Sequence, residues 1–445
     1  MKRKLKRKRR GFWWRIPVSV IIVLAAWTYC FGLGPFDVFP VARGLDGAVA
    51  AYRQAGLPFE AKDLAPNPPI PDTDNAAFVL NEALGAPNDR EIAGIISHLR
   101  IYAHLGNWQK ASALLRANQA TLELLHQAAG KPRLDFGWDW DMAPLLEQPV
   151  LDRALRGIEL VTLEARINAG LGRVDLCSSE IEAAWKLSSL IGQEPCDLAL
   201  LTQVEGDRLT LDALQSAAVT LHGNAAALRS LRSVFAIVQA AKFDLMHSLL
   251  GEAYEALSLA RNGHIIANHM ATGKTDPAEL NEVARKLIRS GVPDELYQRA
   301  ALDQSLIYWT QIKQEADADG DDPDQIGTAM QRLTEQAMRS QSLSAKMLFR
   351  PTFSETVRAI RQPSAYHAVT VAFLSALQVQ ATTGRFPTTI EAVPGAPSDP
   401  YDAQRPLKLG IVPGGIKIYS VGPDGVDNGG ALTSDDIVAR FPASE

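Results

Sequence analysis

The pattern of hydrophobic and polar positions begins with an uncharged apolar run from Ile16 to Gly34, which follows nine Lys and Arg residues within the first 15 positions. A run of this length can span roughly 30 Å of hydrocarbon as a helix. The basic flank favours a cytoplasmic N-terminus. We therefore expect residues 1–34 to form a cytoplasmic tail and a single-pass transmembrane anchor, with the remaining chain on the far side of a membrane.

A cleavable signal peptide has a similar pattern, with a basic region before an apolar one. The segment Phe31–Phe36 contains no Ala-x-Ala cleavage site. An uncleaved signal anchor is therefore the preferred interpretation. It predicts a protein of the bacterial inner membrane whose body lies in the periplasm.

The segment 35–74 contains seven prolines, which remove backbone donors and resist helix formation. We expect a stalk, or a leader wrapped against the body. Asp74 then resembles the N-cap of a helix that continues to Leu84.

Helical periodicity dominates residues 75–363, the predicted body. The stretch Leu151–Ile167 is apolar almost all round, which is typical of a central helix in a bundle. Val234, Val238 and Leu249 belong to a second apolar stripe at helical spacing. The pattern predicts a mainly α fold.

Two stretches of this body resemble each other: Tyr102–Ala111 and Asn168–Cys177. Each places a small-residue turn, at Gly106 or Gly172, between the end of one helix and the start of the next. Such hairpins are typical of tetratricopeptide-like arrays. Because the period is irregular, we expect an irregular array of helical hairpins rather than a regular repeat.

Residues 364–445 form a predicted C-terminal module. A helix ending near Thr382 precedes an alternating, strand-like stretch from Ile416 to Val421. Pro413–Gly415 has the composition of a turn before that strand. The expectation is a small α+β module, one helix followed by a small antiparallel sheet.

The motifs of this module are a Gly-x-x-Pro segment at Gly384, an Asp-Pro pair at Asp399, and Tyr419-Ser-Val-Gly-Pro-Asp-Gly425. Their order resembles the C-terminal half of type II secretion major pseudopilins. In that family the last loop binds calcium, so the resemblance implies Asp424 and Asp436 as carboxylate ligands, with Asp427 and Asp435 as nearby alternatives. Calcium favours several oxygen ligands. The alternative is an Asp/Gly turn without metal.

The chain departs from that family in two ways. About 330 residues separate the anchor from the module, and Arg15 stands where a prepilin has an acidic residue. Assembly into a fibre is therefore not expected, although a divergent pseudopilin remains an alternative. As a whole, the chain also resembles membrane-anchored bacterial proteins with a helical body, a similarity that implies no activity.

Net charge and cysteine content exclude some classes of partner and indicate the state of the thiols. The formal net charge is −5, and without the nine N-terminal cations the remaining chain carries −14. An acidic surface argues against nucleic acid as a partner. No nucleotide-binding or hydrolase motif is complete, so we expect no enzyme and no nucleotide. We expect Cys177 and Cys196 to be buried thiols, with a disulfide as the alternative.

One aromatic and acidic segment, Asp135–Asp141, supports a different function. It combines carboxylates with Trp138 and Trp140, and carboxylate pairs can cleave glycosides. Core anchoring is the commoner role of such a segment. The preferred hypothesis is a membrane-anchored envelope protein that binds another protein or acts as a scaffold, with a link to a secretion or pilus-like assembly. The alternative is a glycan-binding protein or glycan hydrolase.

Overall fold

The computed structural model describes residues 45–85, 89–140, 148–238, 243–271, 294–318, 323–339, 356 and 359–442. Within these ranges, none of the helices is both long and apolar enough to cross a bilayer. The predicted anchor, residues 1–34, lies outside them. The described chain is mainly helical with a small antiparallel sheet near the C-terminus, as predicted.

The chain divides into two compact units. Unit 2 takes its described residues from 65–138, 145–249 and 355–445, and unit 1 from 1–64, 139–144 and 250–354. The helices of unit 2 are α4 (Ala76–Leu84), α5 (Asp89–His104), α6 (Trp108–Ala117), α7 (Gln119–Ala129), α8 (Gln148–Gly170), α9 (Val174–Ile191), α10 (Asp197–Thr220), α11 (Ala225–Val238) and α18 (Gln362–Thr383).

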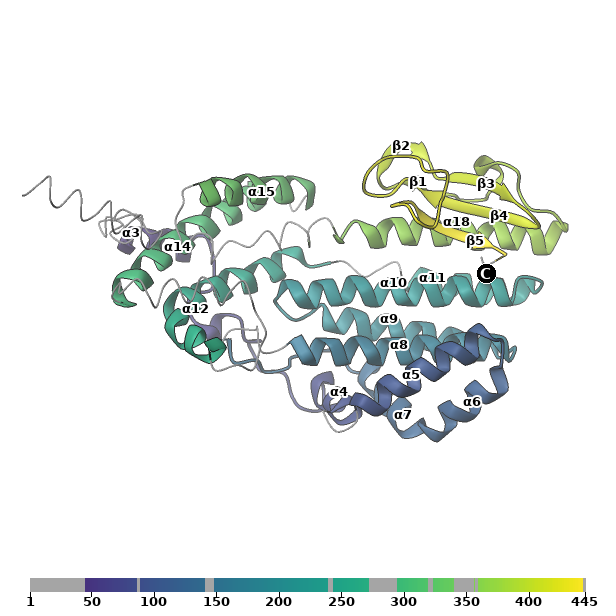
Figure 1. The fold of residues 1–445 in the computed structure, drawn as a ribbon, viewed down its shortest axis with the longest axis horizontal. Helices are drawn as coiled ribbons and strands as arrows, with labels where there is room; N and C mark the ends of the chain where they lie inside the picture. The colour runs from purple at the N-terminus through teal and green to yellow at the C-terminus, as the bar shows by residue number, and fades with distance from the viewer. Residues whose placement is uncertain are drawn as a thin grey trace, which may run out of the picture. The chain divides into compact units, whose positions relative to one another are not determined.

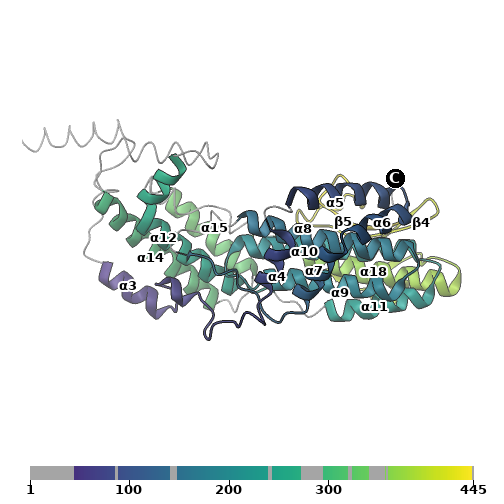
Figure 2. The same cartoon turned by 90° about the horizontal axis from the view of Figure 1, so that it is seen from below.

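Helix α8 lies at the centre of the helices of unit 2, because its apolar residues cover more than one face. It contacts α4, α5, α6, α7, α9 and α10. Ile158, Leu160, Val161 and Ile167 are fully buried. The prediction of a central helix over Leu151–Ile167 is confirmed. Figure 2 shows α5 and α6 alongside these helices.

The two similar stretches form two helical hairpins with the same turn. In the first, the amide of Asn107 donates to the carbonyl of Tyr102 over 2.8 Å, and in the second the amide of Arg173 donates to Asn168 over 2.8 Å. Gly106 and Gly172 have φ of +64° and +73°, which glycine adopts without strain. These two glycines supply the turns as predicted.

The α5–α6 and α8–α9 hairpins also touch. An added Cβ on Gly170, the last residue of α8, would lie 2.2 Å from the indole of Trp108 at the start of α6. Only glycine permits this approach. The hairpins therefore stack at their turns, which lie at the same end of unit 2 (Figure 1).

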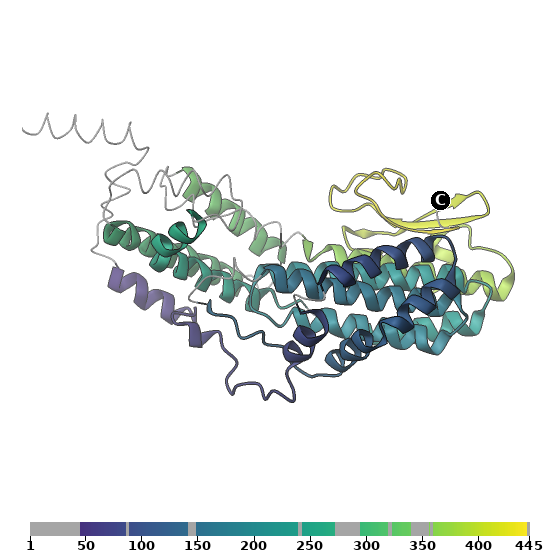
Figure 3. The ribbon, with the colours of Figure 1, turned by 60° about the horizontal axis from the view of Figure 1, so that its bottom comes forward.

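Helix α18 packs against the sheet. It contacts α10 and α11 on one side and strands β4 and β5 on another, and the sheet runs along it in Figures 1 and 3. Ala368, Val369, Phe373 and Leu377 of α18 are buried in one hydrophobic core that includes residues of α9, α10 and α11 as well as Ile416 of the sheet. This core does not stop at residue 364, the predicted start of the module.

The C-terminal strands form two antiparallel ladders. Strands β3 (Lys408–Val412), β4 (Gly415–Ser420) and β5 (Ile437–Phe441) make a sheet in the order β3-β4-β5, with Ile418 opposite both Leu409 and Ala439. Strands β1 (Ser398–Asp399) and β2 (Asp402–Pro406) form a separate pair, preceded by the short helix η4 (Ile390–Ala392). The predicted strand and the turn before it are confirmed.

Unit 1 contains α3 (Leu45–Gln54), η1 (Ala61–Asp63), α14 (Asp294–Ala318), α15 (Pro323–Arg339) and most of α12 (Leu245–Ala271). Helix α3 packs on α14. Phe59 follows α3 and has the guanidinium groups of Arg53 and Arg261 each 4.3 Å from its ring centre, a favourable cation–π arrangement.

This packing corrects part of the prediction for residues 35–74. From Leu45 to Leu64 the segment is folded rather than a free stalk, because Tyr52 is fully buried and Leu57 and Leu64 are also buried. The alternative of a leader wrapped on the body agrees with this part of the segment. The prolines made the helix α3 difficult to recognise.

Two helix boundaries also differ from expectation. The N-cap of α4 is Asn75 rather than Asp74, since its side chain accepts from the amide of Ala77. The apolar stripe from Val234 to Leu249 does not lie on one described helix, because α11 ends at Val238 and α12 begins at Leu245. Asp244 accepts from the amide of His247 and so starts the new helix.

Candidate functional site

The predicted calcium ligands lie in and beside the loop that joins β4 to β5, residues 421–436. The ends of this loop meet. An added Cβ on Gly422 would lie 1.9 Å from the carbonyl oxygen of Asp435, and the φ of Gly422 is +70°. The loop therefore closes on itself at the end of the central strand β4.

Two of the four aspartates form local turns on the exposed side of the loop. Asp424 accepts from the amide of Val426 over 2.9 Å. Asp427 accepts from the amide of Gly429 over 2.9 Å and from the hydroxyl of Tyr419 over 3.2 Å. These carboxylates shape the loop whether or not a metal binds.

Asp436 differs from the other three because it is 8% exposed. Its Oδ2 accepts from the amide of Gly430 over 2.7 Å, whereas its Oδ1 is buried without a hydrogen-bond partner. A buried carboxylate oxygen without a partner is costly. Asp436 is therefore the aspartate of this loop that has most to gain from a bound cation.

The pKa of the nearby Tyr419 is affected by the negative charge around the loop. Burial, and secondly the charges of Asp427 and Asp436, raise the pKa of Tyr419 to about 12. Asp427 and Asp436 therefore both act on one hydroxyl. Asp435 is exposed.

Asp399 is a fifth carboxylate at this site that the sequence interpretation did not assign. It is 1% exposed and accepts from the Ser420 hydroxyl over 2.7 Å, the Val421 amide over 3.0 Å and the Tyr401 amide over 3.0 Å. It ties β1 to the start of the loop. The Asp-Pro pair of the C-terminal motif was the available signal.

The four predicted ligands do not form a three-carboxylate cluster. Among the described residues, His126, Glu164 and Glu180 are the one set of at least three His, Cys, Asp or Glu side chains whose ligand atoms converge. Any calcium ion in the loop would need backbone oxygens in addition to Asp436 and its neighbours. The calcium site stays a prediction.

The aromatic segment at 135–140 has its indoles inside the protein. Trp138 and Trp140 are buried, and the ring of Phe136 stacks on that of Trp138 with centres 5.9 Å apart. Asp135 is fixed by Asn75, which accepts from its amide over 3.0 Å and donates to its carbonyl over 2.8 Å. The segment offers no exposed indole face for a sugar, and Asp141 lies outside the described residues.

The His126, Glu164 and Glu180 cluster joins three helices. The Nε2 atom of His126 on α7 lies 2.5 Å from a Glu180 oxygen on α9 and 3.6 Å from a Glu164 oxygen on α8. Burial, and secondly the charge of Glu180, raise the pKa of Glu164 to about 7. The hydrogen bond to Glu180 raises the pKa of His126.

Sequence reasoning missed this cluster because its members are far apart in the chain, 54 residues in the case of His126 and Glu180. One local signal was present, the pair Glu123 and His126 at a spacing of three on a helix. A second was Glu180, an acidic residue next to Ile181 on the buried face of its helix.

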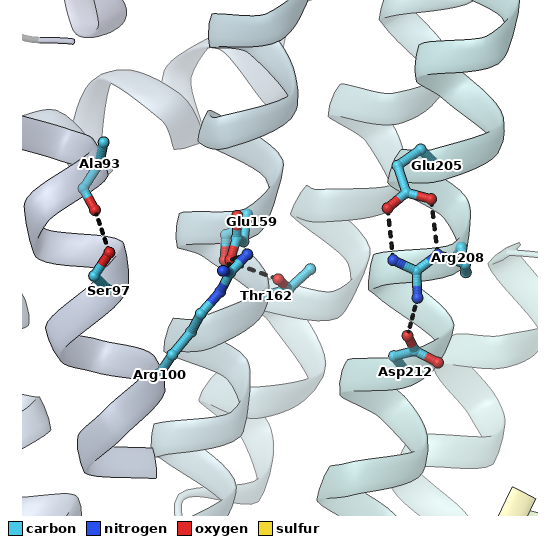
Figure 4. Close-up of polar contacts among 8 residues, drawn as sticks. All are labelled: Ala93, Ser97, Arg100, Glu159, Thr162, Glu205, Arg208 and Asp212. Atoms are coloured by element: carbon cyan, nitrogen blue, oxygen red, sulfur yellow. Dashed lines mark hydrogen bonds and ion pairs between the residues drawn. The ribbon is translucent and has the colours of Figure 1, made fainter. Parts of the chain in front are cut away.

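Other charged side chains of unit 2 are used in ion pairs (Figure 4). Arg100 of α5 pairs with Glu159 of α8. On α10, Arg208 donates to Glu205 over 2.7 Å and to Asp212 over 2.6 Å. Burial raises the pKa of Asp212 to about 6, although Arg208 opposes this shift. The first pair links α5 to α8, and the others join neighbouring turns of α10.

Both described cysteines, Cys177 and Cys196, are buried thiols, as expected. Burial raises the pKa of Cys177 to about 12, so its thiol is unreactive at neutral pH. No protein-family model, curated protein or solved structure matches this chain.

Proposed function

We propose that this protein is a non-enzymatic, membrane-anchored envelope protein whose helical body binds another protein. The basic and apolar N-terminal sequence supports an inner-membrane anchor with the body in the periplasm. The stacked α5–α6 and α8–α9 hairpins support a tetratricopeptide-like body, since such hairpins provide binding surface without catalytic groups.

Exposed apolar side chains at the stacked turns carry this proposal. Ile101 and Leu105, in and just after the last turn of α5, are 54% and 69% exposed, and Leu176 in the first turn of α9 is 49% exposed. All three are within a few residues of the turns that meet through Trp108 and Gly170. Large apolar groups gathered at one end of a unit mark a surface for protein contact.

A photo-crosslinking amino acid at position 105 of the full-length chain, in native membranes, tests the proposal. A matched probe at Leu432, which is 61% exposed in the C-terminal loop, is the control. We expect one dominant protein adduct from position 105, and its loss when Ile101 and Leu176 are replaced by Asp. If neither position 105 nor position 432 gave a specific adduct, the protein-binding role would be contradicted.

The same experiment tests the link to secretion. The helix packed on a small antiparallel sheet supports the resemblance to a pseudopilin C-terminal domain. Adducts with secretion or pilus components from position 432 alone would assign docking to this pseudopilin-like module. A divergent pseudopilin would require processing before Phe12, which N-terminal sequencing detects.

Calcium is proposed as a structural ion of the module, with Asp436 as its principal ligand. We expect the full-length chain to melt at a higher temperature in calcium than in chelator, and Asp436→Asn to remove the difference. Asp72→Asn, in an exposed turn, is the control and should retain it. Equal melting temperatures for the unsubstituted chain would exclude the site.

A glycan-binding or glycan-cleaving role has less support, because Trp138 and Trp140 are buried. Hydrolysis of cell-wall glycan that is lost in Asp139→Asn would restore that alternative.

A further inference from the structure

The junction of α7, α8 and α9 brings together side chains of the types that bind transition metals. One ligand atom from each of His126, Glu164 and Glu180 lies within 4.8 Å of the other two. Imidazole nitrogen and carboxylate oxygen are common ligands of zinc and related divalent ions. The three residues come from three helices, so the fold positions them together.

Two features of the cluster favour a cation over a purely structural ion pair. The Glu180 side chain is only 8% exposed and the Glu164 side chain 18% exposed. Oε2 of Glu164 is buried without a hydrogen-bond partner. Two carboxylates held this close in a low-dielectric environment repel each other unless a proton or a cation lies between them.

The distances are also compatible with a metal ion. Ligand atoms around tetrahedral zinc are roughly 3.4 Å apart, given bonds of about 2.1 Å. His126 and Glu164 already have a separation of 3.6 Å. Binding would replace the 2.5 Å contact between His126 and Glu180. The His126 side chain is 36% exposed, which leaves a route for an ion from solvent.

We propose that His126, Glu164 and Glu180 form a binding site for one divalent first-row transition metal ion, such as Zn²⁺. Glu123 lies about one turn before His126 on α7, and its negative charge also acts on His126. The ion would join α7 to α8 and α9. This site is separate from the loop proposed to bind calcium.

Metal binding should release protons. The pKa values of His126 and Glu164 are both raised, so each group keeps its proton to a higher pH than it would in water, and a metal must displace any proton bound there. Glu123, Glu180 and Cys177 are the other titratable groups around them. We therefore expect the affinity for the metal to rise with pH.

Cobalt provides the test, because it reports its ligands by visible absorption. The full-length chain, prepared without a polyhistidine tag and treated with chelator, should bind one equivalent of Co²⁺ with d–d absorption bands that Zn²⁺ abolishes. Glu164→Gln and His126→Asn should each weaken binding at least tenfold. Glu164→Gln should fold normally, since Gln resembles the protonated acid.

Matched controls are His98→Asn, an exposed histidine of α5, and Glu159→Gln, the partner of Arg100. Both should bind Co²⁺ as the unsubstituted chain does. The proposal is overturned if no stoichiometric binding occurs, or if binding is unchanged in both ligand variants. A thiolate charge-transfer band lost in Cys177→Ser would overturn the proposed ligand set.

Discussion

At the scale of single residues, Asp207 of α10 is the clearest case of a buried acid. It is fully buried, and burial raises its pKa to about 8, against a smaller opposing effect of the Ser188 hydrogen bond. The Ser188 hydroxyl lies 2.6 Å from Asp207 and 2.9 Å from the carbonyl of Gln203. With Asp207 protonated, both contacts can be hydrogen bonds, because Asp207 donates to Ser188 and Ser188 donates to Gln203.

Asp207 should make unit 2 less stable as pH rises. The folded chain keeps this proton up to about pH 8, whereas the unfolded chain loses it near 3.8. The stabilisation that Asp207 contributes is therefore complete below about pH 3.8. It is lost progressively as the pH rises from there to about 8, by at most about 1.4 kcal/mol per pH unit. Asp207→Asn should remove this contribution and stabilise the protein relative to the unsubstituted chain at pH 8.

Urea unfolding of both proteins at several pH values measures this difference. Asp72→Asn, an exposed substitution, should leave the pH dependence unchanged. A constant difference between Asp207→Asn and the unsubstituted chain from pH 5 to pH 8 would show that Asp207 is ionised in the folded state.

Several residue-level predictions needed only local information. Gly106 and Gly172 were identified because small residues end one helix before another begins. The N-cap at Asn75 was misplaced by one residue, because Asp74 is an equally good cap and only the amide geometry separates them. His126, Glu164 and Glu180 could not be grouped, because nothing in the sequence states which faces of α7, α8 and α9 meet.

At the scale of elements, the contact between two hairpins depends on the absence of a side chain at Gly170. Gly170→Ala should destabilise unit 2, because its methyl group would overlap the Trp108 ring. Gly172→Ala is the matched control. Its φ is +73° but its Cβ would meet no atom within 4 Å, so it should cost about 1–2 kcal/mol.

A double-mutant cycle separates steric overlap from helix propensity. In a Trp108→Ala background, Gly170→Ala should lose its extra cost, whereas the cost of Gly172→Ala should not change. Additive effects of Gly170→Ala and Trp108→Ala would show that the hairpins do not meet at this point.

Element types were predicted better than element boundaries and packing. The helix over Gln362–Thr383 and the strand over Gly415–Ser420 follow directly from periodicity. The start of a separate helix at Leu245 was missed, because apolar residues continue at helical spacing and the cap at Asp244 is a single polar residue. Helix α3 was missed because the prolines around it outweighed a short amphipathic stretch.

At the scale of the whole molecule, unit 2 has one core shared by the helical body and the sheet. Phe373 of α18 is fully buried within it. Phe373→Ala should cost about 3–5 kcal/mol and should weaken α10 and β4 together. Hydrogen exchange in increasing denaturant would show both elements losing protection at the same concentration.

A control in unit 1 makes that test specific. Ile312→Ala, at a buried position of α14, should leave exchange in β4 unchanged. Loss of protection in the sheet before α10 in the Phe373 variant would instead show that residues 364–445 fold as an independent module, which is the boundary that the sequence suggested.

The shared core has a consequence for the order in which the protein can be made. Ribosomes release residues 148–238 well before α18, and the sheet follows later still. Leu211 and Leu214 of α10 belong to the core that α18 and the sheet complete. Until those elements are made, this apolar face of α10 is exposed to solvent. A nascent or prematurely terminated chain therefore displays an apolar surface that the full chain hides, and chaperones or proteases can distinguish the two by that surface alone.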